Sequence, residues 1–322
     1  AHGSAISHTA ILAHSMNIPT VIGIGDEFLA NIRPGEQALV DGFSGEVILE
    51  PDAGILSKLT APQEKSTDTS EGTHTADGTH VSIYSADDPC APLPEYADGI
   101  AVFGCPLLSD ETKQYEYYRA IAERTPDCRA IIRMPAISPK DPDRQVKYDQ
   151  QIRAVFRAAS HGEPGILFPM ITSVPEARKI LAACDDAKMK LRAEGVKCSE
   201  NVKIGFMVEI PAAAIISDCL APMADFFIID SDSIARHTLA CYEEDCFSPD
   251  FADGQLEAVM RLIGNSARNA VKNGARIGIC GSLAGDTSLT GDFLRMGIDS
   301  FCVTPDRLAE VRKRVTEVDL EV

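Results

Sequence analysis

The sequence has no tryptophan and few cations, since 30 Lys and Arg residues stand against 48 Asp and Glu residues. The formal net charge is −18 at pH 7, and a surface this acidic repels nucleic-acid phosphates and anionic lipid headgroups. We therefore expect no nucleic-acid partner and no membrane partner. A small anionic ligand would need a local cationic pocket.

Long apolar runs and paired cysteines are also missing. No stretch of about 18 apolar residues appears, which argues against a membrane span. The first residues lack the basic-then-apolar pattern of a signal peptide, so we expect a cytoplasmic location. The ten cysteines include no C-x-x-C pair and several lie in apolar runs, which favours free buried thiols over a disulfide framework or a zinc site.

From residue 81 onward, short β-type runs alternate with helical stretches. The predicted strands are 81–85, 99–103, 130–133, 165–168, 204–208, 226–229, 276–280 and 300–304, and the predicted helices include 144–159, 173–196, 255–273 and 305–317. The strands are continuously apolar, as expected of parallel strands buried on both faces. Eight even units predict a (β/α)8 TIM barrel over residues 81–322, with a doubly wound open sheet as the alternative.

The first 55 residues predict a small separate piece. Ser7 is a plausible N-cap, and His8 then falls in the first helical turn, where free backbone N–H groups favour an anion. His8 either carries a phosphoryl group there or merely begins a helix. A hairpin is predicted over 37–50, and the polar, Thr- and Gly-rich residues 56–80 predict a flexible linker.

Polar residues at the ends of the predicted barrel strands form the candidate site, because TIM-barrel active sites lie at the C-terminal ends of the strands. Glu209 with Asp230 or Asp232 could hold a hard divalent cation. Arg133 could bind a carboxylate or phosphate, and Cys280 could protonate an enolate. The structural alternatives are helix caps, Asp232 above all, rim salt bridges and a buried small thiol.

Three segments carry a resemblance to a known family. They are SHTAILAHSMNIPTVIG at 7–23, IGFMVEIPAAA at 204–214 and IGICGSLAGD at 277–286. They resemble the phosphoenolpyruvate-utilising enzymes, which include enzyme I of the bacterial sugar phosphotransferase system. The resemblance implies a divergent, N-terminally truncated member: part of a swivelling phosphohistidine domain at 1–55, then the linker and a phosphoenolpyruvate-binding barrel.

The resemblance also implies an activity and roles for individual residues. Phosphoryl would pass from phosphoenolpyruvate to a histidine and on to a phosphocarrier protein, in a homodimer that uses Mg2+ and serves sugar transport. The implied roles are phosphoryl acceptor for His8, proton donor for Cys280, substrate binding for Arg133, Ser231 and Gly281, and Mg2+ binding for Glu209, with Asp232 as a substitute second ligand.

Several positions depart from the family pattern. The departures are Gly104-Cys105-Pro106 for an Arg-Thr-Glu segment, residues 136–141 for an Asp-Ile-Gly-Gly-Asp-Lys segment, Ser233 for a metal-binding Asp, Glu243 for a phosphate-binding Arg, and Ser282 for a Glu. Losing one such electrostatic contact typically costs about 3–4 kcal/mol, or 10²–10³ in rate. The candidate replacement cations are Lys140, Arg144 and Arg236.

Two other functions stay open on these residues. One is a catalytically degenerate relative that binds phosphoenolpyruvate, or a similar small anionic metabolite, as a sensor or regulator. The other is a Mg2+-dependent lyase of small 2-oxo acids that uses Glu209, Arg133 and an aspartate of the same rim.

Overall fold

The computed structural model describes parts of residues 20–51 and then residues 72–86, 93–108, 110–125, 129–135, 137, 142–162, 164–199, 201–240 and 256–320. The described residues fall into two compact units, one before residue 52 and one after residue 71. His8 and its predicted helix lie outside the described residues, so the phosphoryl-acceptor role stays a prediction.

The first unit contains the predicted hairpin strands. Strands β1 (Ala38–Asp41) and β2 (Glu46–Leu49) pair antiparallel, with Ala38 opposite Leu49. At the open end, the Glu50 N–H donates to the Gln37 carbonyl at 2.7 Å, and the Gln37 N–H donates to Glu50 Oε1 at 2.9 Å. Residues 42–45 of the predicted hairpin lie outside the described residues.

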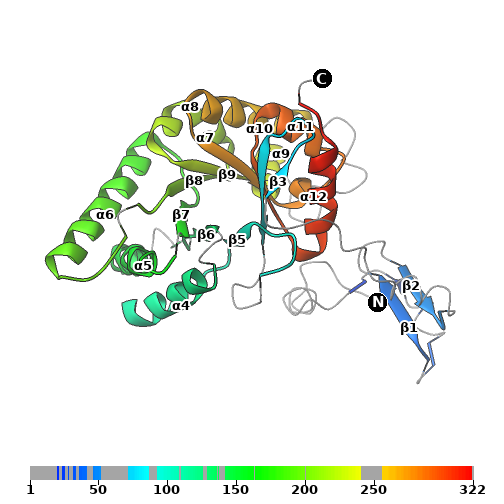
Figure 1. The fold of residues 1–322 in the computed structure, drawn as a ribbon, viewed down its shortest axis with the longest axis horizontal. Coiled ribbons are helices and arrows are strands. Elements are labelled where there is room, and N and C mark those ends of the chain that lie inside the picture. Colours follow the sequence, from blue (N-terminus) through cyan, green and yellow to red (C-terminus); the bar gives the residue numbers. More distant parts are fainter. Residues whose placement is uncertain are drawn as a thin grey trace. The chain divides into compact units, whose positions relative to one another are not determined.

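The second unit is a closed barrel of parallel strands (Figure 1). Its strands are β4 (His80–Ser85), β5 (Gly99–Val102), β6 (Arg129–Arg133), β7 (Pro164–Phe168), β8 (Ile204–Val208), β9 (Phe226–Asp230), β10 (Arg276–Cys280) and β11 (Ser300–Val303). Each strand pairs with the next along the chain, and β11 pairs with β4 to close the ring. The predicted TIM barrel is confirmed.

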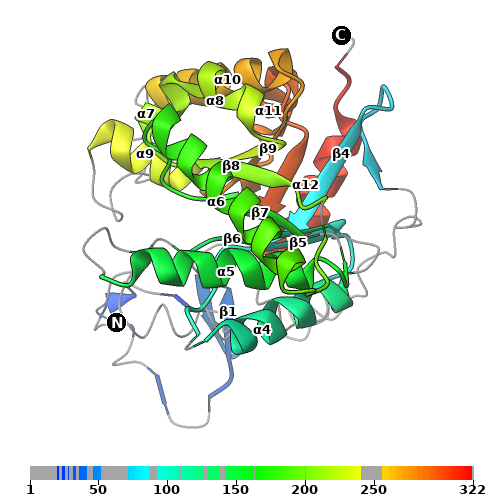
Figure 2. The same cartoon turned by 90° about the vertical axis from the view of Figure 1, so that its left-hand side faces the viewer.

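Helices lie around the outside of the strands (Figures 1 and 2). The α-helices described are α4 (Glu111–Arg124), α5 (Arg144–Ala158), α6 (Val174–Ala193), α7 (Pro211–Ile215), α8 (Ser217–Leu220), α9 (Ser231–Leu239), α10 (Leu256–Lys272), α11 (Thr290–Met296) and α12 (Leu308–Glu317). Short 3-10 turns are η2 (Ala221–Met223), η4 (Ser282–Gly285) and η5 (Pro305–Arg307). The Ser173 hydroxyl accepts from the Glu176 N–H at 3.3 Å and so caps α6, at the start of the helix predicted over 173–196.

The barrel has two apolar layers because successive strand residues point to opposite faces. One layer packs strand residues against the surrounding helices. The other contains strand residues alone and fills the barrel interior: Tyr84, Ala101, Ile131, Leu167, Met207, Ile228, Cys280 and Cys302. Burial on both faces explains why the strand sequences are mostly apolar instead of alternating. Cys280 thus points into the barrel.

Residues 72–80 correct the predicted extent of the linker. They form a turn and a strand, β3 (Thr73–His74), which pairs antiparallel with β4. The Thr75 N–H donates to the Thr79 carbonyl at 2.9 Å, and Asp77 accepts from the Thr79 hydroxyl at 2.6 Å. Thr, Asp and Gly are turn formers as well as linker residues, so composition alone could not separate the two structures.

Two further features bear on the sequence expectations. Among the described helices, none is long and apolar enough to cross a membrane. Of the described cysteines, Cys184, Cys280 and Cys302 are both buried and free.

Candidate active site

An ion pair lies at the C-terminal rim of the barrel. Arg133 is the last residue of β6 and Glu209 directly follows β8, so parallel strands bring both to the same edge. Arg133 Nη2 donates to Glu209 Oε1 at 2.6 Å, and Arg133 Nε lies 3.1 Å from Met207 Sδ. The Glu209 side chain is 2% exposed and that of Arg133 is 22% exposed. A buried carboxylate is thereby paired with a cation that still reaches solvent.

The second oxygen of Glu209 is held by a backbone group that sequence reasoning did not assign to the site. The Met170 N–H donates to Glu209 Oε2 at 2.7 Å. Met170 follows β7 and has a φ of 56°, a left-handed conformation that is unusual for a non-glycine residue. Such strain typically costs about 1–3 kcal/mol and clusters at functional sites. No motif in the sequence predicts this left-handed conformation of Met170.

Cys280 ends β10, where the sequence places it, and is 4% exposed. Burial raises the pKa of Cys280 well above its usual range, and the nearby carboxylates of Asp230, Asp232 and Glu209 raise it further. The thiol is therefore protonated at neutral pH. It is suited to donate a proton and poorly suited to act as a thiolate nucleophile.

Asp230, and not Asp232, caps helix α9. Asp230 Oδ1 accepts from the backbone N–H groups of Asp232 and Ser233, both at 3.1 Å. Asp232 lies in the first helical turn, and its Oδ1 accepts from the Ser282 N–H at 2.8 Å. The capping alternative for Asp232 is therefore wrong, because the residue two positions earlier occupies that place.

Ser231 and Gly281 complete the junction between the loops that follow β9 and β10. The Ser231 hydroxyl accepts from the Leu283 N–H at 3.3 Å. Gly281 has a φ of 91°, and a Cβ added there would lie 2.4 Å from Ser231 Oγ and 2.9 Å from Asp232 Cγ. Only glycine fits this approach without displacing its neighbours. These predicted substrate-binding residues thus share one tight junction beside Cys280.

The predicted Mg2+ ligands differ in how well they fit a cation. In the described part of the chain, no group of three or more His, Cys, Asp or Glu side chains is arranged to hold a metal. Mg2+ often uses one or two protein carboxylates together with substrate phosphates and water. Both oxygens of Glu209 accept hydrogen bonds, from Arg133 and from Met170, so Glu209 would take Mg2+ once Arg133 leaves Oε1. On Asp232, the hydrogen bonds from Ser282 and Ser231 go to Oδ1.

The described cations at the rim are fewer than the family pattern implies. Cys105 stands where an arginine segment is expected, and burial raises the pKa of its thiol to about 12, so it is uncharged. Arg236 Nη2 donates to the Ser233 hydroxyl at 3.2 Å. Lys140, Glu243 and the Arg144 side chain lie outside the described residues. Arg133 is therefore the cation that the structure places beside Glu209.

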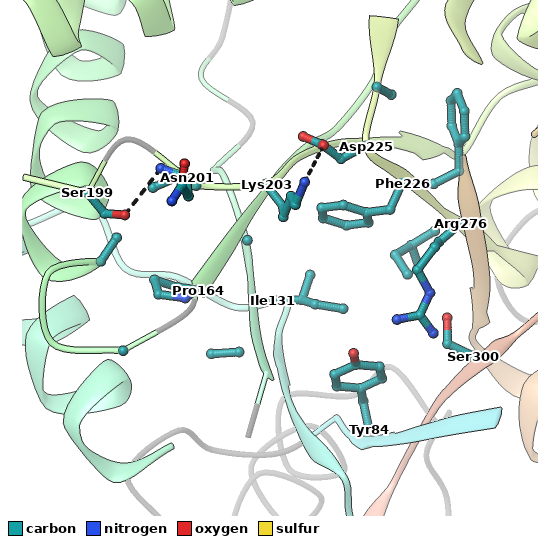
Figure 3. Close-up of a pocket in the computed structure, with 18 of the residues that line it drawn as sticks. Tyr84, Ile131, Pro164, Ser199, Asn201, Lys203, Asp225, Phe226, Arg276 and Ser300 are labelled. Atoms are coloured by element: carbon teal, nitrogen blue, oxygen red, sulfur yellow. Dashed lines mark hydrogen bonds and ion pairs between the residues drawn. The ribbon is translucent and has the colours of Figure 1, made fainter. Parts of the chain in front are cut away.

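The opposite, N-terminal end of the barrel carries a pocket of about 700 Å³ (Figure 3). Phe226 and Arg276 line it, and Figure 3 shows the Arg276 guanidinium near Ser300 and Tyr84. Arg276 Nε donates to Asp299 Oδ2 at 2.9 Å, and Lys203 pairs with Asp225 at the same distance. We call this end the floor.

Known proteins place the chain in a family. A family model described as the PEP-binding domain of PEP-utilising enzymes matches residues 129–320, and one described as their mobile domain matches residues 1–45. The chain belongs to the PEP-utilising enzyme family. The resemblance in the rim and His8 segments is thereby confirmed at the level of the family.

Two relatives and one solved structure illustrate the similarity. The phosphoenolpyruvate-protein phosphotransferase of Priestia megaterium is 29% identical over 358 residues, which cover 98% of this chain and 62% of that protein. The Streptococcus equinus protein of the same name is 28% identical over 371 residues, with the same coverage. The chain thus spans about 62% of the length of these relatives. The lead(II) complex of Haloferax volcanii malate synthase shares the fold, with a TM-score of 0.52 and 13% identity over 77% of this chain and 74% of that one.

Proposed function

We propose that the chain takes a phosphoryl group from phosphoenolpyruvate onto His8 and passes it to a phosphocarrier protein. One observation carries the proposal: the barrel mouth combines the Arg133–Glu209 ion pair with the buried, protonated thiol of Cys280. The family matches to both a PEP-binding and a mobile domain support it. The part played by His8 rests on sequence.

In this proposal, Arg133, His8 and Cys280 each perform one part of the phosphoryl transfer. Arg133 binds the substrate phosphate, or its carboxylate, through its guanidinium. The phosphorus–oxygen bond of the substrate breaks as a phosphorus–nitrogen bond forms at His8. The electron pair left on the enolate returns through carbon 3, which takes the proton of Cys280 and gives pyruvate. The thiolate then recovers its proton from water.

Glu209 is the residue we assign to Mg2+. The ion would supply positive charge that offsets the phosphate and carboxylate of the substrate. Because Arg133 Nη2 occupies Glu209 Oε1, the guanidinium must turn away from that oxygen and toward the substrate. Asp232 stays a predicted second ligand.

The test is phosphopeptide mapping after incubation with [32P]phosphoenolpyruvate and Mg2+. Label on the peptide that contains His8, and its loss in a His8→Ala variant, is the expected result. Absence of label on His8 in the folded chain would refute the proposal. A matched His14→Ala variant, at the second histidine of the same segment, is expected to keep the label.

One observation favours a second function, in which the barrel binds a small anionic metabolite without turning it over. The neutral Cys105 stands where the family pattern places an arginine, and each lost cation costs about 3–4 kcal/mol of transition-state stabilisation. A calorimetric titration separates the two functions: phosphoenolpyruvate binding without pyruvate release or His8 label supports the sensor. Pyruvate release from 4-hydroxy-2-oxo acids with Mg2+ would instead support the lyase.

The proposal includes a cytoplasmic homodimer, by resemblance to the family. Light scattering of the purified chain tests the dimer, with a molar mass near twice the 34.6 kDa of one chain as the expected result. A mass of one chain at micromolar concentration would contradict it.

A further inference from the structure

We propose that Asp232 is a positioning residue: its carboxylate locks the turn after Cys280 and thereby fixes the thiol in the barrel mouth. The inference rests on the proposed function, because it assigns Cys280 the proton transfer. It gives Asp232 a role that differs from the predicted metal ligand.

Helix α9 does not need Asp232 for its N-terminal cap. Asp230 already caps it, with Oδ1 accepting two backbone N–H groups and Oδ2 accepting the Ser233 hydroxyl at 2.7 Å. In the first turn of a helix, the side chain of Asp232 is thus not used for the cap. It reaches instead across to the neighbouring loop.

Asp232 binds the loop that follows β10. Its Oδ1 accepts from the Ser282 N–H at 2.8 Å and from the Ser231 hydroxyl at 3.3 Å. The Ser231 hydroxyl oxygen in turn accepts from the Leu283 N–H. Two successive backbone donors of the 3-10 turn η4 are therefore satisfied by side chains of α9. Hydrogen bonds to a charged acceptor are among the stronger ones in proteins.

The contact between Asp232 and the turn is joined to the Cys280 thiol through Gly281. Gly281 lies between Cys280 and Ser282, with a φ of 91°, and its Cα approaches Asp232 and Ser231 so closely that no Cβ would fit. The turn that follows Cys280 therefore has one close-packed arrangement against α9. Preorganised donors and acids need such support, since a shift of about 1 Å is enough to slow a reaction strongly.

The experiment compares Asp232→Ala, Asp232→Asn and the unchanged chain in EDTA, without phosphoenolpyruvate. Asparagine keeps an acceptor oxygen for the Ser282 N–H, whereas alanine does not. Two quantities are measured: deuterium uptake of the peptide spanning 281–285, and the rate at which iodoacetamide alkylates Cys280, resolved by mass spectrometry. Asp292→Ala, an exposed aspartate on α11, is the matched control.

We expect Asp232→Ala to raise both rates at least about tenfold, since an opened turn exposes its amides and the thiol beside it. Asp232→Asn and Asp292→Ala are expected to stay within about twofold of the unchanged chain. If alanine does not fold at position 232, Asp232→Ser takes its place, because the serine hydroxyl is one bond shorter.

Two results would overturn the proposal: rates within twofold of the unchanged chain in Asp232→Ala, or an Asp232→Asn variant as fast as the alanine variant. The first result is what a metal ligand alone would give, because no metal is bound in EDTA. The second would show that the charge of Asp232, and not its acceptor oxygen, holds the turn. Because neither measurement uses phosphoenolpyruvate, failure of the proposed function appears separately, as an unlabelled His8 in a chain whose turn is closed.

Discussion

The two ends of the barrel each carry an arginine–carboxylate pair, and the pairs differ in burial. At the rim, Glu209 is 2% exposed and Arg133 is 22% exposed, with 2.6 Å between them. At the floor, Arg276 and Asp299 are 36% and 31% exposed, with 2.9 Å between them. A pair that stays in water contributes about 0–1 kcal/mol, whereas breaking a buried pair costs about 3–5 kcal/mol.

The rim also uses a strained backbone group to hold its buried carboxylate. The rim has Met170 in a left-handed conformation with its N–H directed at Glu209. At the floor, the ring of Phe226 lies against Gly165 and Gly205, a contact that only fills space. In TIM barrels the C-terminal face carries the chemistry and the N-terminal face carries stability. Rim contacts therefore hold polar groups of the site in place, while the Phe226 contact at the floor packs a ring against the backbone of two strands.

The largest expected effect distinguishes two cysteines that lie opposite each other on neighbouring strands. Cys280 on β10 and Cys302 on β11 are register partners, and both are buried in the barrel interior. Cys280→Ala is expected to slow pyruvate formation from phosphoenolpyruvate by about 10²–10⁴, because it removes the proton donor. Cys302→Ala should change the rate by less than about threefold and cost about 1 kcal/mol of stability. A lactate dehydrogenase-coupled assay measures the rates, and equal losses would contradict the assignment.

The second expected effect distinguishes Arg133 at the rim from Arg276 at the floor. Arg133→Met is expected to slow His8 labelling by about 10²–10³ through the loss of the anion-binding cation. Arg276→Met should leave labelling within about twofold and change the free energy of unfolding by about 1 kcal/mol or less. Labelling time courses and urea denaturation give the two quantities.

A double variant tests whether the unpaired charge of Glu209 causes the loss of stability in Arg133→Met. Arg133→Met leaves the buried Glu209 without its cation, at a cost of about 3–5 kcal/mol. Adding Glu209→Gln removes that charge, so stability should return, while labelling stays slow because the residue assigned to Mg2+ is lost as well. Urea denaturation gives the free energy of unfolding, and a value as low as that of Arg133→Met alone would contradict the unpaired charge as the cause.

The third effect lies at the floor. A Cβ at position 205 would lie 2.4 Å from the Phe226 ring, so Gly205→Ala is expected to destabilise the chain by about 1–3 kcal/mol. In a Phe226→Ala background the same change should cost less, because the clashing ring is gone. Thermal denaturation of the four chains gives the coupling energy, and additive costs would contradict the contact. His8 labelling should not change.

The smallest expected effect is a fall in the free energy of unfolding at high pH. Buried cysteines of both apolar layers contribute to it. Burial raises the pKa of Cys184 to about 12 from an ordinary value of 9.0, and burial also raises that of Cys280. Between pH 9 and 12 the unfolded chain loses these protons while the folded chain keeps them. The free energy of unfolding should therefore be unaffected below pH 9 and fall above it, by about 1.4 kcal/mol per pH unit for each thiol.

Urea denaturation at pH 8 and pH 10 measures this slope. Cys184→Ala removes a thiol from the layer under the helices, and Cys280→Ala removes one from the barrel interior. Each variant is expected to lose the same increment of about 1 kcal/mol. A slope unchanged by Cys184→Ala would contradict the shift.

The barrel was readable from sequence where burial alone decides the structure. Strands β8 and β10 have the predicted bounds, because both faces of each are covered and every residue except Arg276, at the start of β10, is apolar or small. The turn at 75–79 was misassigned, because its Thr, Asp and Gly residues suit a linker equally well. Its structure depends on pairing with β4 and on the Ala76 N–H donating to Val318 at 2.8 Å, contacts that composition does not contain.

For the candidate site, the sequence predicts only which residue types lie at the strand ends. The sequence determined that an arginine, a glutamate and a thiol lie at the C-terminal ends of three different strands, which is enough to expect an anion-binding rim on a barrel. It could not determine that Asp230 takes the cap and frees Asp232 for the Ser282 N–H, since neighbouring aspartates are equally suited to capping. Nor could it show the positive φ of Met170.

Tertiary structure alone decided which groups meet. Arg133 and Glu209 stand 76 positions apart in the chain and 2.6 Å apart in space. The physical reason is that parallel strands end at a common rim, so partners are chosen by the tilt and register of the barrel. Local sequence sets what each strand end offers, and closure of the sheet sets what it touches.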